Sequence, residues 1–466
     1  MVSPCSDRSR INSELCQGYE AVPMQPEHIP LVFQMRSSPK NKAALHGGNM
    51  NLATWEVICQ QSLQNPTEAN FIIAKALVPV AWLKIEDVHS EMPWISMLVV
   101  HEAFHHQGVG SYAVRFAEAF VLSNGATKVG IRTTTDNIIA HECYRKLGYV
   151  IIEEGECTNG DGKTRRGYSF SKDHLDSLST NVDGVSFRVK AAHDFSFLQK
   201  LGTVFCVFDA QDSGNLCFGL EQNGARFFVK YAGAQTIAFP GHPENAIARL
   251  RHAVQAYEDL RHPSLVSLRN HYPTEHGYVA VFDWVEGDSL RAHWVYSAWE
   301  MLHLPQSPNV RFGNLPLSKR LAVLENIIAF HQHVQSKGYV AVDFYDGSMI
   351  YDFATDTFHI CDIDEYSLAP LFNSMGRMWG STRFMSPEEY QLGAAIDEQT
   401  MVFVMGASAF VLLGGASNRS KTLWQAGDAL YDVALKAVSP QKCERYPSLA
   451  EFAKAWNAAA VADSLV

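Results

Sequence analysis

Two aspartates in the C-terminal half of the chain have a spacing that suits phosphoryl transfer. Asp343 follows the strand-like run VAV, and Asp362 lies nineteen residues later in the strand-like run FHICDI. Phosphoryl transfer needs a carboxylate that accepts a hydroxyl proton and a carboxylate that holds Mg²⁺. The short connection between the two runs therefore predicts that one site receives both a catalytic base and a metal ligand.

A glycine-rich turn in the N-terminal half is a second candidate site. Between a strand-like and a helix-like run the chain reads His105, His106, Gln107, Gly108, Val109, Gly110 and Ser111. Glycines let backbone N–H groups approach an anion, and the N-terminus of the following helix adds partial positive charge. About thirty residues further on, Asn137 and Tyr144 lie in a helix–turn–strand unit. This turn predicts a phosphate-binding loop.

The composition fits a protein that buries full cores. The chain has 466 residues, 47% hydrophobic and 19% charged, and a net charge of −11. Its length predicts two or three domains, and its acidity argues against a nucleic-acid or membrane partner. The nine cysteines are scattered and lack CxxC spacing, which predicts reduced thiols and a cytoplasmic location. The polar start does not resemble a signal peptide, and the apolar stretch 401–416 predicts a buried core helix.

The order of the predicted elements differs between the two halves of the chain. Residues up to about 172 alternate helix and strand patterns, which predicts a mixed α/β layer fold. The polar, turn-rich stretch around 172–184 is the best linker candidate. Beyond it, strand patterns with one helix precede a largely helical region. This second half therefore predicts a small β-rich lobe, a larger helical lobe and a cleft between them.

Residues 18–172 resemble the GNAT family of acetyl-CoA-dependent N-acetyltransferases. The family's pyrophosphate loop has the form Q/R-x-x-G-x-G/A, and His105 stands where Gln or Arg is usual. The resemblance implies that the amides of His105 to Ser111 cradle the pyrophosphate of acetyl-CoA. It also implies that the backbone of Leu98, Val99 and Val100 pairs with the pantetheine arm. The family acylates many amines, so the amine acceptor stays open.

The same resemblance assigns roles near the sulfur of acetyl-CoA. Asn137 and Tyr144 match the family's later motif, in which the tyrosine hydroxyl protonates the departing thiolate. The alternative is that Tyr144 is a core aromatic residue on an amphipathic helix. The general base stays open: Glu91 and Glu102 lie near the right strand, and either could be a surface carboxylate.

Residues 190–458 resemble a protein-kinase-like domain. The pieces that carry the resemblance occur in the family's order: Gly214 and Gly219, Lys230, Asp343, Asp362, Ser386-Pro387-Glu388 and Arg445. The resemblance implies that the two glycines and Lys230 bind ATP, Asp343 is the catalytic base and Asp362 binds Mg²⁺. It also implies a structural ion pair between Glu388 and Arg445.

Several positions depart from the kinase pattern. The catalytic loop reads Ala341-Val342-Asp343, Tyr345 replaces the usual lysine, and Ser348 replaces the metal-binding asparagine. The next motif reads Asp362-Ile363-Asp364, and Ala253 stands where the small-lobe helix usually has a glutamate. Asp346 and Asp364 add carboxylates, which are either replacement metal ligands or loop caps. We therefore expect Asp362, Ser348 and Asp364 as the Mg²⁺ ligands.

These observations predict an α/β (α+β) protein, with a GNAT-type mixed α/β domain followed by a bilobal protein-kinase-like domain. The expected boundaries are a polar tail (1–17), the acetyltransferase domain (18–172), a linker (173–189), a small lobe (about 190–287) and a large lobe (about 288–458). We expect a bifunctional N-acetyltransferase and Ser/Thr kinase-like phosphotransferase. Its acceptors are an amine and a hydroxyl of a protein or small molecule. Two alternatives stay open: an aminoglycoside-type acetyl- and phosphotransferase, and an acetyltransferase regulated by a nucleotide-binding pseudokinase.

Overall fold

A computed structural model describes residues 18–76, 78–158, 161–173, 175–209, 211–293 and 295–464. Its internal contacts divide the chain into two compact units. Unit 1 comprises the residues up to Ser177 together with the short segment Ser297–Glu300. Unit 2 comprises Leu178–Tyr296 and Met301–Val466. The expected polar tail, 1–17, lies outside the described residues.

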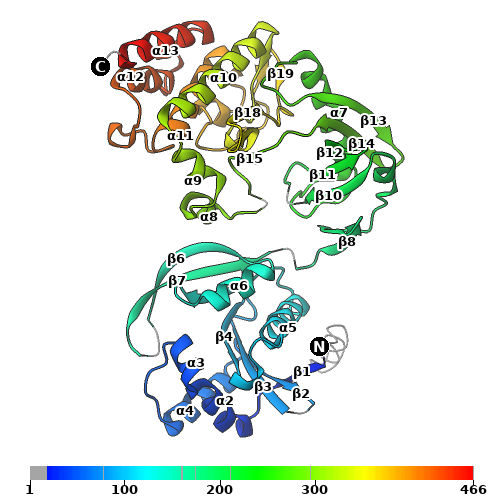
Figure 1. Cartoon of the computed structure of the whole chain (residues 1–466), viewed down its shortest axis with the longest axis vertical. Helices are drawn as coiled ribbons and strands as arrows, with labels where there is room; N and C mark the ends of the chain where they lie inside the picture. Colours follow the sequence, from blue (N-terminus) through cyan, green and yellow to red (C-terminus); the bar gives the residue numbers. More distant parts are fainter. Residues whose placement is uncertain are drawn as a thin grey trace. The chain divides into compact units, whose positions relative to one another are not determined.

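Unit 1 is built on a seven-stranded sheet with the order β1-β2-β3-β4-β5-β7-β6 (Figure 1). Its strands are β1 (Tyr19–Pro23), β2 (Ala69–Lys75), β3 (Val78–Glu86), β4 (Trp94–Val100), β5 (Val129–Thr134), β6 (Val150–Thr158) and β7 (Thr164–Lys172). All neighbours pair antiparallel except β4 and β5, which are parallel and pair only through Trp94 with Gly130 and Ile95 with Ile131. The two strands therefore part after Ile95, and the rest of β4 has a free edge toward β5.

Five helices cover the two faces of this sheet: α2 (Ile29–Ser37), α3 (Pro39–Ala44), α4 (Leu52–Gln64), α5 (Val109–Ser123) and α6 (Ile138–Lys146). Alternate side chains of a strand point to opposite faces, and β3 shows the consequence. Leu83 packs with α5 and α6 in one core, whereas its neighbour Trp82 packs with α2 and α4 in the other. The predicted mixed α/β layer architecture of this half is confirmed.

Unit 2 begins with strands. A hairpin of β8 (Leu178–Val182) and β9 (Val185–Val189) precedes a five-stranded antiparallel sheet with the order β10-β11-β12-β14-β13. These strands are β10 (Thr203–Phe208), β11 (Asn215–Gln222), β12 (Ala225–Ala232), β13 (Leu268–Thr274) and β14 (Gly277–Asp283), and α7 (Pro243–Asp259) contacts β12, β13 and β14. The stretch expected as a linker, 173–189, thus holds the β8–β9 hairpin. Its turn is Asp183-Gly184 with positive φ at both residues, as a two-residue hairpin turn requires.

The remainder of unit 2 is mainly helical. Its helices are α9 (Pro308–Gly313), α10 (Leu317–Ser336), α11 (Glu398–Leu413), α12 (Asp428–Ala437) and α13 (Leu449–Ser464), and α8 (Ala298–His303) crosses the boundary between the units in the sequence. Short strands connect them: β15 (Asp288–Ser289), β16 (Tyr339–Val340), β17 (Met349–Asp352), β18 (Thr357–Ile360), β19 (Ser367–Leu368), β20 (Leu371–Phe372) and β21 (Ala395–Ile396). The predicted core helix at 401–416 is confirmed, because α11 is buried along most of its length.

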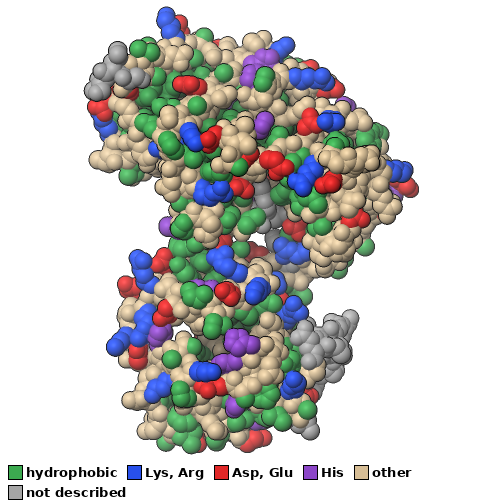
Figure 2. Space-filling view, in the orientation of Figure 1, with side chains coloured by type: hydrophobic (Ala, Val, Ile, Leu, Met, Phe, Trp, Pro, Cys, Tyr) green, Lys and Arg blue, Asp and Glu red, His purple; other side chains and the backbone are tan. Residues whose placement is uncertain are grey.

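The surface of each unit carries mixed charges. Figure 2 shows acidic and basic side chains interspersed on the visible face. None of the seven cysteines in the described ranges forms a disulfide. Among the helices that the structure describes, none is long and apolar enough to cross a membrane.

Candidate active sites

The loop between β4 and α5 presents a run of free backbone amides. His106 and Gly108 have φ values of 60° and 84°, which turn the chain into the first turn of α5. The N–H groups of residues 106–111 make no hydrogen bond with any described residue, and the first one that does is that of Tyr112, to Gly108. Free amides at a helix N-terminus attract phosphate oxygens. This loop therefore has the form expected of a pyrophosphate cradle.

The histidine that replaces the usual Gln or Arg of this loop has a local role. The His105 Nε2 atom lies 3.1 Å from the carbonyl oxygen of Val100. The same oxygen accepts a hydrogen bond of 2.8 Å from Asn41 Nδ2, and Asn41 also donates to Met35. His105 and the buried Asn41 thus fix the end of β4.

Fewer residues of β4 keep free backbone groups at its open edge than the sequence indicated. The His101 N–H bonds to Val80 on β3, so Val99, two residues earlier, also directs its backbone polar groups to β3. Leu98 and Val100 face the other way, but the Val100 carbonyl is already occupied by Asn41 and His105. Of the three residues expected to pair with pantetheine, Leu98 is the one left with both backbone groups free on the open side.

Asn137 and Tyr144 both belong to α6. Asn137 is the N-cap, and its side chain accepts a 3.3 Å hydrogen bond from the Ala140 N–H. Tyr144 is buried against Phe170 and Tyr149, and burial raises the pKa of its phenol well above the usual value. The hydroxyl of Tyr144 makes no hydrogen bond with a described residue. Tyr144 is thus a core aromatic residue that also keeps a proton available at neutral pH.

Neither carboxylate considered as the base of unit 1 has a suitable environment. Glu91 is exposed in the turn before β4. Glu102 accepts a 2.8 Å hydrogen bond from the Lys40 N–H, and the Ser38 hydroxyl and this N–H lower its pKa. A carboxylate with a lowered pKa, engaged at the start of α3, is a weak proton acceptor.

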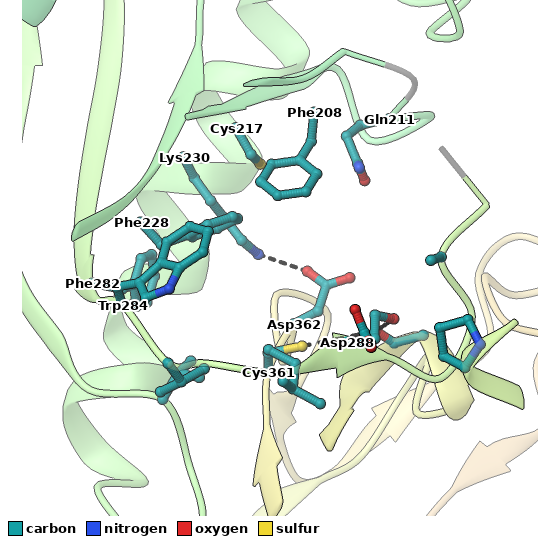
Figure 3. Close-up of a pocket in the computed structure, with 18 of the residues that line it drawn as sticks. Phe208, Gln211, Cys217, Phe228, Lys230, Phe282, Trp284, Asp288, Cys361 and Asp362 are labelled. Atoms are coloured by element: carbon teal, nitrogen blue, oxygen red, sulfur yellow. Dashed lines mark hydrogen bonds and ion pairs between the residues drawn. The ribbon is translucent and has the colours of Figure 1, made fainter. Parts of the chain in front are cut away.

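Unit 2 contains a cavity of about 420 Å³ between its five-stranded sheet and its helical part. Figure 3 shows Phe228, Phe282 and Trp284 together on one side of the cavity, and Phe208 lies against Phe228 with ring centroids 5.8 Å apart. Lys230 reaches in from β12 toward Asp362 (Figure 3). A mainly apolar cavity with a few convergent polar groups is the usual form of a small-molecule site.

Lys230 is held between two carboxylates. Its Nζ lies 2.6 Å from Asp362 Oδ1 and 2.7 Å from Asp364 Oδ1. The Tyr257 hydroxyl donates to the same Asp364 oxygen at 2.9 Å and accepts from the Ile363 N–H at 3.1 Å. Burial opposes the charge of Lys230, but the two carboxylates outweigh it and raise its pKa well above the usual value. The buried lysine is therefore a cation at the wall of the cavity.

The two glycines expected to bind ATP are required by packing. Gly214 has φ 85°, and a Cβ atom there would collide with Phe239 and Ala246. A Cβ atom on Gly219 would collide with Cys206 and Phe205 on the neighbouring strand β10. Both positions therefore need glycine with or without a ligand.

Asp343 and Asp362 lie in left-handed turns, with φ values of 61° and 55°. Burial, followed by the charges of Asp362 and Glu365, raises the pKa of Asp343 to about 8. The carboxylate of Asp343 makes no hydrogen bond with a described residue. The structure thus brings the two aspartates within electrostatic reach, as their spacing predicted.

The other residues expected at the metal site are buried. Ser348 has no exposed surface, and its Oγ atom lacks a hydrogen-bond partner among the described residues. Asp346 is also fully buried, and both of its oxygens bind Arg383 at 2.7 Å. Asp346 therefore does not replace a metal ligand. No group of three or more His, Cys, Asp or Glu side chains in the described ranges is arranged to hold a metal ion.

The predicted ion pair between Glu388 and Arg445 is confirmed. Arg445 Nη1 lies 2.7 Å from Glu388 Oε1, and Nη2 lies 3.0 Å from Oε2. Arg445 also donates to the carbonyls of Ser439, Gln399 and Pro440. This buried pair fastens the segment before α11 to the segment before α13.

The sequence analysis missed Tyr257 and Arg383. Tyr257 lies four residues after Ala253 and therefore on the same face of α7. The sequence analysis considered only position 253, where the glutamate is missing, and not the residue one turn later. Arg383 follows the segment GST, and its charge was the available signal that it could pair with a carboxylate, which in the structure is Asp346.

Comparison with known proteins supports the first site. No curated protein matched the chain. Residues 47–149 match the model of the Acetyltransferase (GNAT) family, and all of them lie in unit 1. The matched stretch includes the amide-rich loop and both Asn137 and Tyr144. Residues 47–149 are therefore a GNAT acetyltransferase domain, which implies acetyl-CoA as the acyl donor and a transferase activity.

Proposed function

We propose that unit 1 transfers the acetyl group of acetyl-CoA to the nitrogen of an amine acceptor. The observation that carries this proposal is the run of free amides at 106–111 beside the open edge of β4. Such a run matches the row of phosphate oxygens in the donor, and the open edge matches its amide-containing arm.

The residues of unit 1 then have separate tasks. The amides of residues 106–111 bind the pyrophosphate, and His105 supports the loop through Val100. Leu98 hydrogen-bonds the pantetheine arm. Tyr144, whose phenol is protonated at neutral pH and makes no hydrogen bond with a described residue, supplies the proton to the departing thiolate.

Gly110→Glu tests the amide cradle. A Cβ atom at Gly110 meets no other atom within 4 Å, so the substitution should leave the fold unchanged. Its carboxylate would stand at the cradle and repel phosphate. We expect the affinity for acetyl-CoA, measured by calorimetry, to fall at least about 100-fold. Gly155→Glu is the matched control, because Gly155 on β6 is equally open and should change nothing. Equal affinity of both variants would rule out the cradle.

We also propose that unit 2 binds ATP and transfers its terminal phosphoryl group to a hydroxyl. The observation that carries this proposal is the buried Lys230, paired with Asp362 at the wall of the cavity. By the resemblance to protein kinases, Lys230 would bind the phosphates of ATP, Asp362 would bind the metal ion, and Asp343 would accept the proton of the acceptor hydroxyl. A five-stranded sheet with one long helix, followed by a helical part, supports a bilobal kinase-like arrangement.

Asp364 has a different task from the one its sequence position indicated. We propose that Asp364, held by Tyr257, replaces the missing helix glutamate as the second partner of Lys230. Mg²⁺ needs only one or two protein carboxylates when phosphates and waters complete its shell. Asp362 fits this need, because its side chain is 47% exposed while one oxygen binds Lys230. The unpartnered Ser348 Oγ is the other oxygen donor of the proposed set.

A regulatory role for unit 2 is a second candidate. Asp346 is held in an ion pair by Arg383, and Ser348 is buried. The proposed metal site therefore has fewer strong ligands than that of an active kinase. A unit that binds a nucleotide without turnover would then control unit 1.

The ionisation of Asp343 gives a pH dependence to test. Because its folded pKa, about 8, exceeds the usual value near 4, the proton on folded Asp343 stabilises unit 2 at low pH. That contribution is lost as the pH rises toward 8. Asp343→Asn cannot ionise, so its stability relative to the parent should grow from pH 4 to 8, reaching roughly 1–3 kcal/mol. Urea unfolding in metal-free buffer measures this, and a pH-independent difference would contradict it.

We further propose a cytoplasmic location, an amine acceptor for unit 1 and a protein or small-molecule hydroxyl acceptor for unit 2. The mixed surface charge supports neither a nucleic-acid nor a membrane partner.

A further inference from the structure

A histidine–carboxylate pair lies at the end of β5 in unit 1. The His46 Nε2 atom is 3.2 Å from Asp136 Oδ1 and 3.1 Å from Asp136 Oδ2. The Thr134 hydroxyl donates to Asp136 Oδ1 at 2.6 Å and lies 3.4 Å from His46 Nε2. The hydroxyl of Thr134, followed by His46, holds the pKa of Asp136 below its usual range, so Asp136 stays charged. A charged carboxylate at Nε2 favours the histidine tautomer that carries its proton there.

The pair lies where β4 and β5 have separated. Asn41 on α3 is bonded to the last carbonyl of β4, at Val100, and His46 five residues later contacts Thr134 at the last position of β5. The segment from 41 to 46 therefore spans the mouth between the two strand ends. This segment connects to α4, which covers the sheet face opposite α5 and α6. His46 thus approaches the opening from the face that does not carry the amide-rich loop and α5.

The position of His46 is fixed by backbone contacts. Its carbonyl accepts a 3.1 Å hydrogen bond from the Asp161 N–H, in the connection between β6 and β7, and its φ is 46°. Its side chain is 19% exposed, and Nδ1 makes no hydrogen bond with any residue that the structure describes. With Nε2 directed at Asp136, the lone pair of Nδ1 is available to a ligand.

We propose that His46, oriented by Asp136, is the general base of the acetyl transfer proposed for unit 1. Nδ1 takes one proton from the acceptor ammonium, and the neutral amine then attacks the thioester carbonyl carbon. A C–N bond forms and the C–S bond breaks with its electron pair on sulfur. The second proton lost by nitrogen is balanced by the proton that sulfur gains, so the products are the amide, the thiol of CoA and protonated His46.

Other titratable groups lie near the pair. They are His141, whose Nε2 lies 2.9 Å from the Thr134 carbonyl oxygen, and the ion pair of Asp161 with Arg165. Asp161 is engaged by Arg165 through both oxygens, and burial lowers the pKa of His141. Among the charged groups that the structure describes here, Asp136 is the one in direct contact with the His46 ring.

Magnetic resonance tests the position of His46 without catalysis. In protein labelled with ¹³C-histidine, the His46 signal is identified by its loss in His46→Gln. Addition of acetyl-CoA should shift this signal more than addition of CoA, because the acetyl group is what approaches Nδ1. The signal of His89, exposed in the turn before β4, should not move. Acetyl-CoA that binds without moving the His46 signal overturns the proposal. If acetyl-CoA does not bind at all, the function proposed for unit 1 fails.

Kinetics with two amines tests the role. n-Butylamine is an ammonium ion at pH 7 and must lose a proton, whereas hydroxylamine is already neutral. His46→Gln should slow CoA release with n-butylamine by about 100-fold, and by far less with hydroxylamine. Asp136→Asn should move the pH profile of the n-butylamine reaction at an unchanged acetyl-CoA KM, and His89→Gln should match the parent. Equal losses with both amines would mean a structural role and overturn the proposal.

Discussion

Asp362→Asn should reduce phosphoryl transfer from Mg²⁺-ATP by at least about 1,000-fold while unit 2 stays folded. The asparagine keeps the size of the side chain, but it removes the charge that would hold the metal between the phosphates. Asp362 is 47% exposed, so its replacement leaves no buried cavity. Transfer of label from γ-labelled ATP to protein or to a hydroxyl acceptor measures the effect.

Asp352→Asn is the control for this experiment. Asp352 ends β17 on the same hairpin, and its carboxylate caps a turn at Ala354 and Thr355, which asparagine can also do. It should label as fast as the parent. Labelling by Asp362→Asn at the parental rate would make the metal assignment wrong. A parent that binds ATP without labelling would favour the regulatory candidate over turnover.

Arg445→Met should destabilise unit 2 by about 3–5 kcal/mol. The arginine side chain is fully buried, and its removal leaves the Glu388 carboxylate buried beside Thr400 with Lys442 3.8 Å away as the nearest remaining cation. An uncompensated buried charge carries a penalty of this size. Urea unfolding of unit 2 followed by tryptophan fluorescence gives the difference in unfolding free energy.

The comparison variant is Arg226→Met, which removes an exposed arginine paired with Glu221 and Glu286. Exposed ion pairs contribute little, so the loss should stay within about 1 kcal/mol. A cost for Arg445→Met no larger than that for Arg226→Met would contradict a structural role of the buried pair.

Most of the fold of unit 1 could be predicted from local sequence patterns. The alternation of helix and strand patterns up to about residue 172 predicted the mixed α/β layer fold that the structure has. The amide-rich loop was also predictable, since glycine at 108 provides the left-handed turn before α5. Long-range pairs could not be predicted in this way. His46 and Asp136 are ninety residues apart in the sequence, and the folding of the sheet brings them together.

Unit 2 shows the same limit in another form. The sequence predicted that Asp364 lies near the site, but its partner depends on which residue α7 presents to Lys230. Ala253 offers no oxygen, and Tyr257 one turn later offers a hydroxyl, so Asp364 turns to Lys230 and Tyr257. The β8–β9 hairpin was missed because a polar composition was read as a linker, although Asp183-Gly184 is a strong hairpin signal.

The most direct test of the central claim is the formation of acetylated amine by the parent chain. Acetyl-CoA is incubated with hydroxylamine, n-butylamine or spermidine, and the product is quantified by mass spectrometry beside Gly110→Glu. We predict product with at least one amine at a rate well above that of Gly110→Glu, whose cradle is blocked. A parent no faster than Gly110→Glu with every amine would contradict an acetyltransferase that works through this loop.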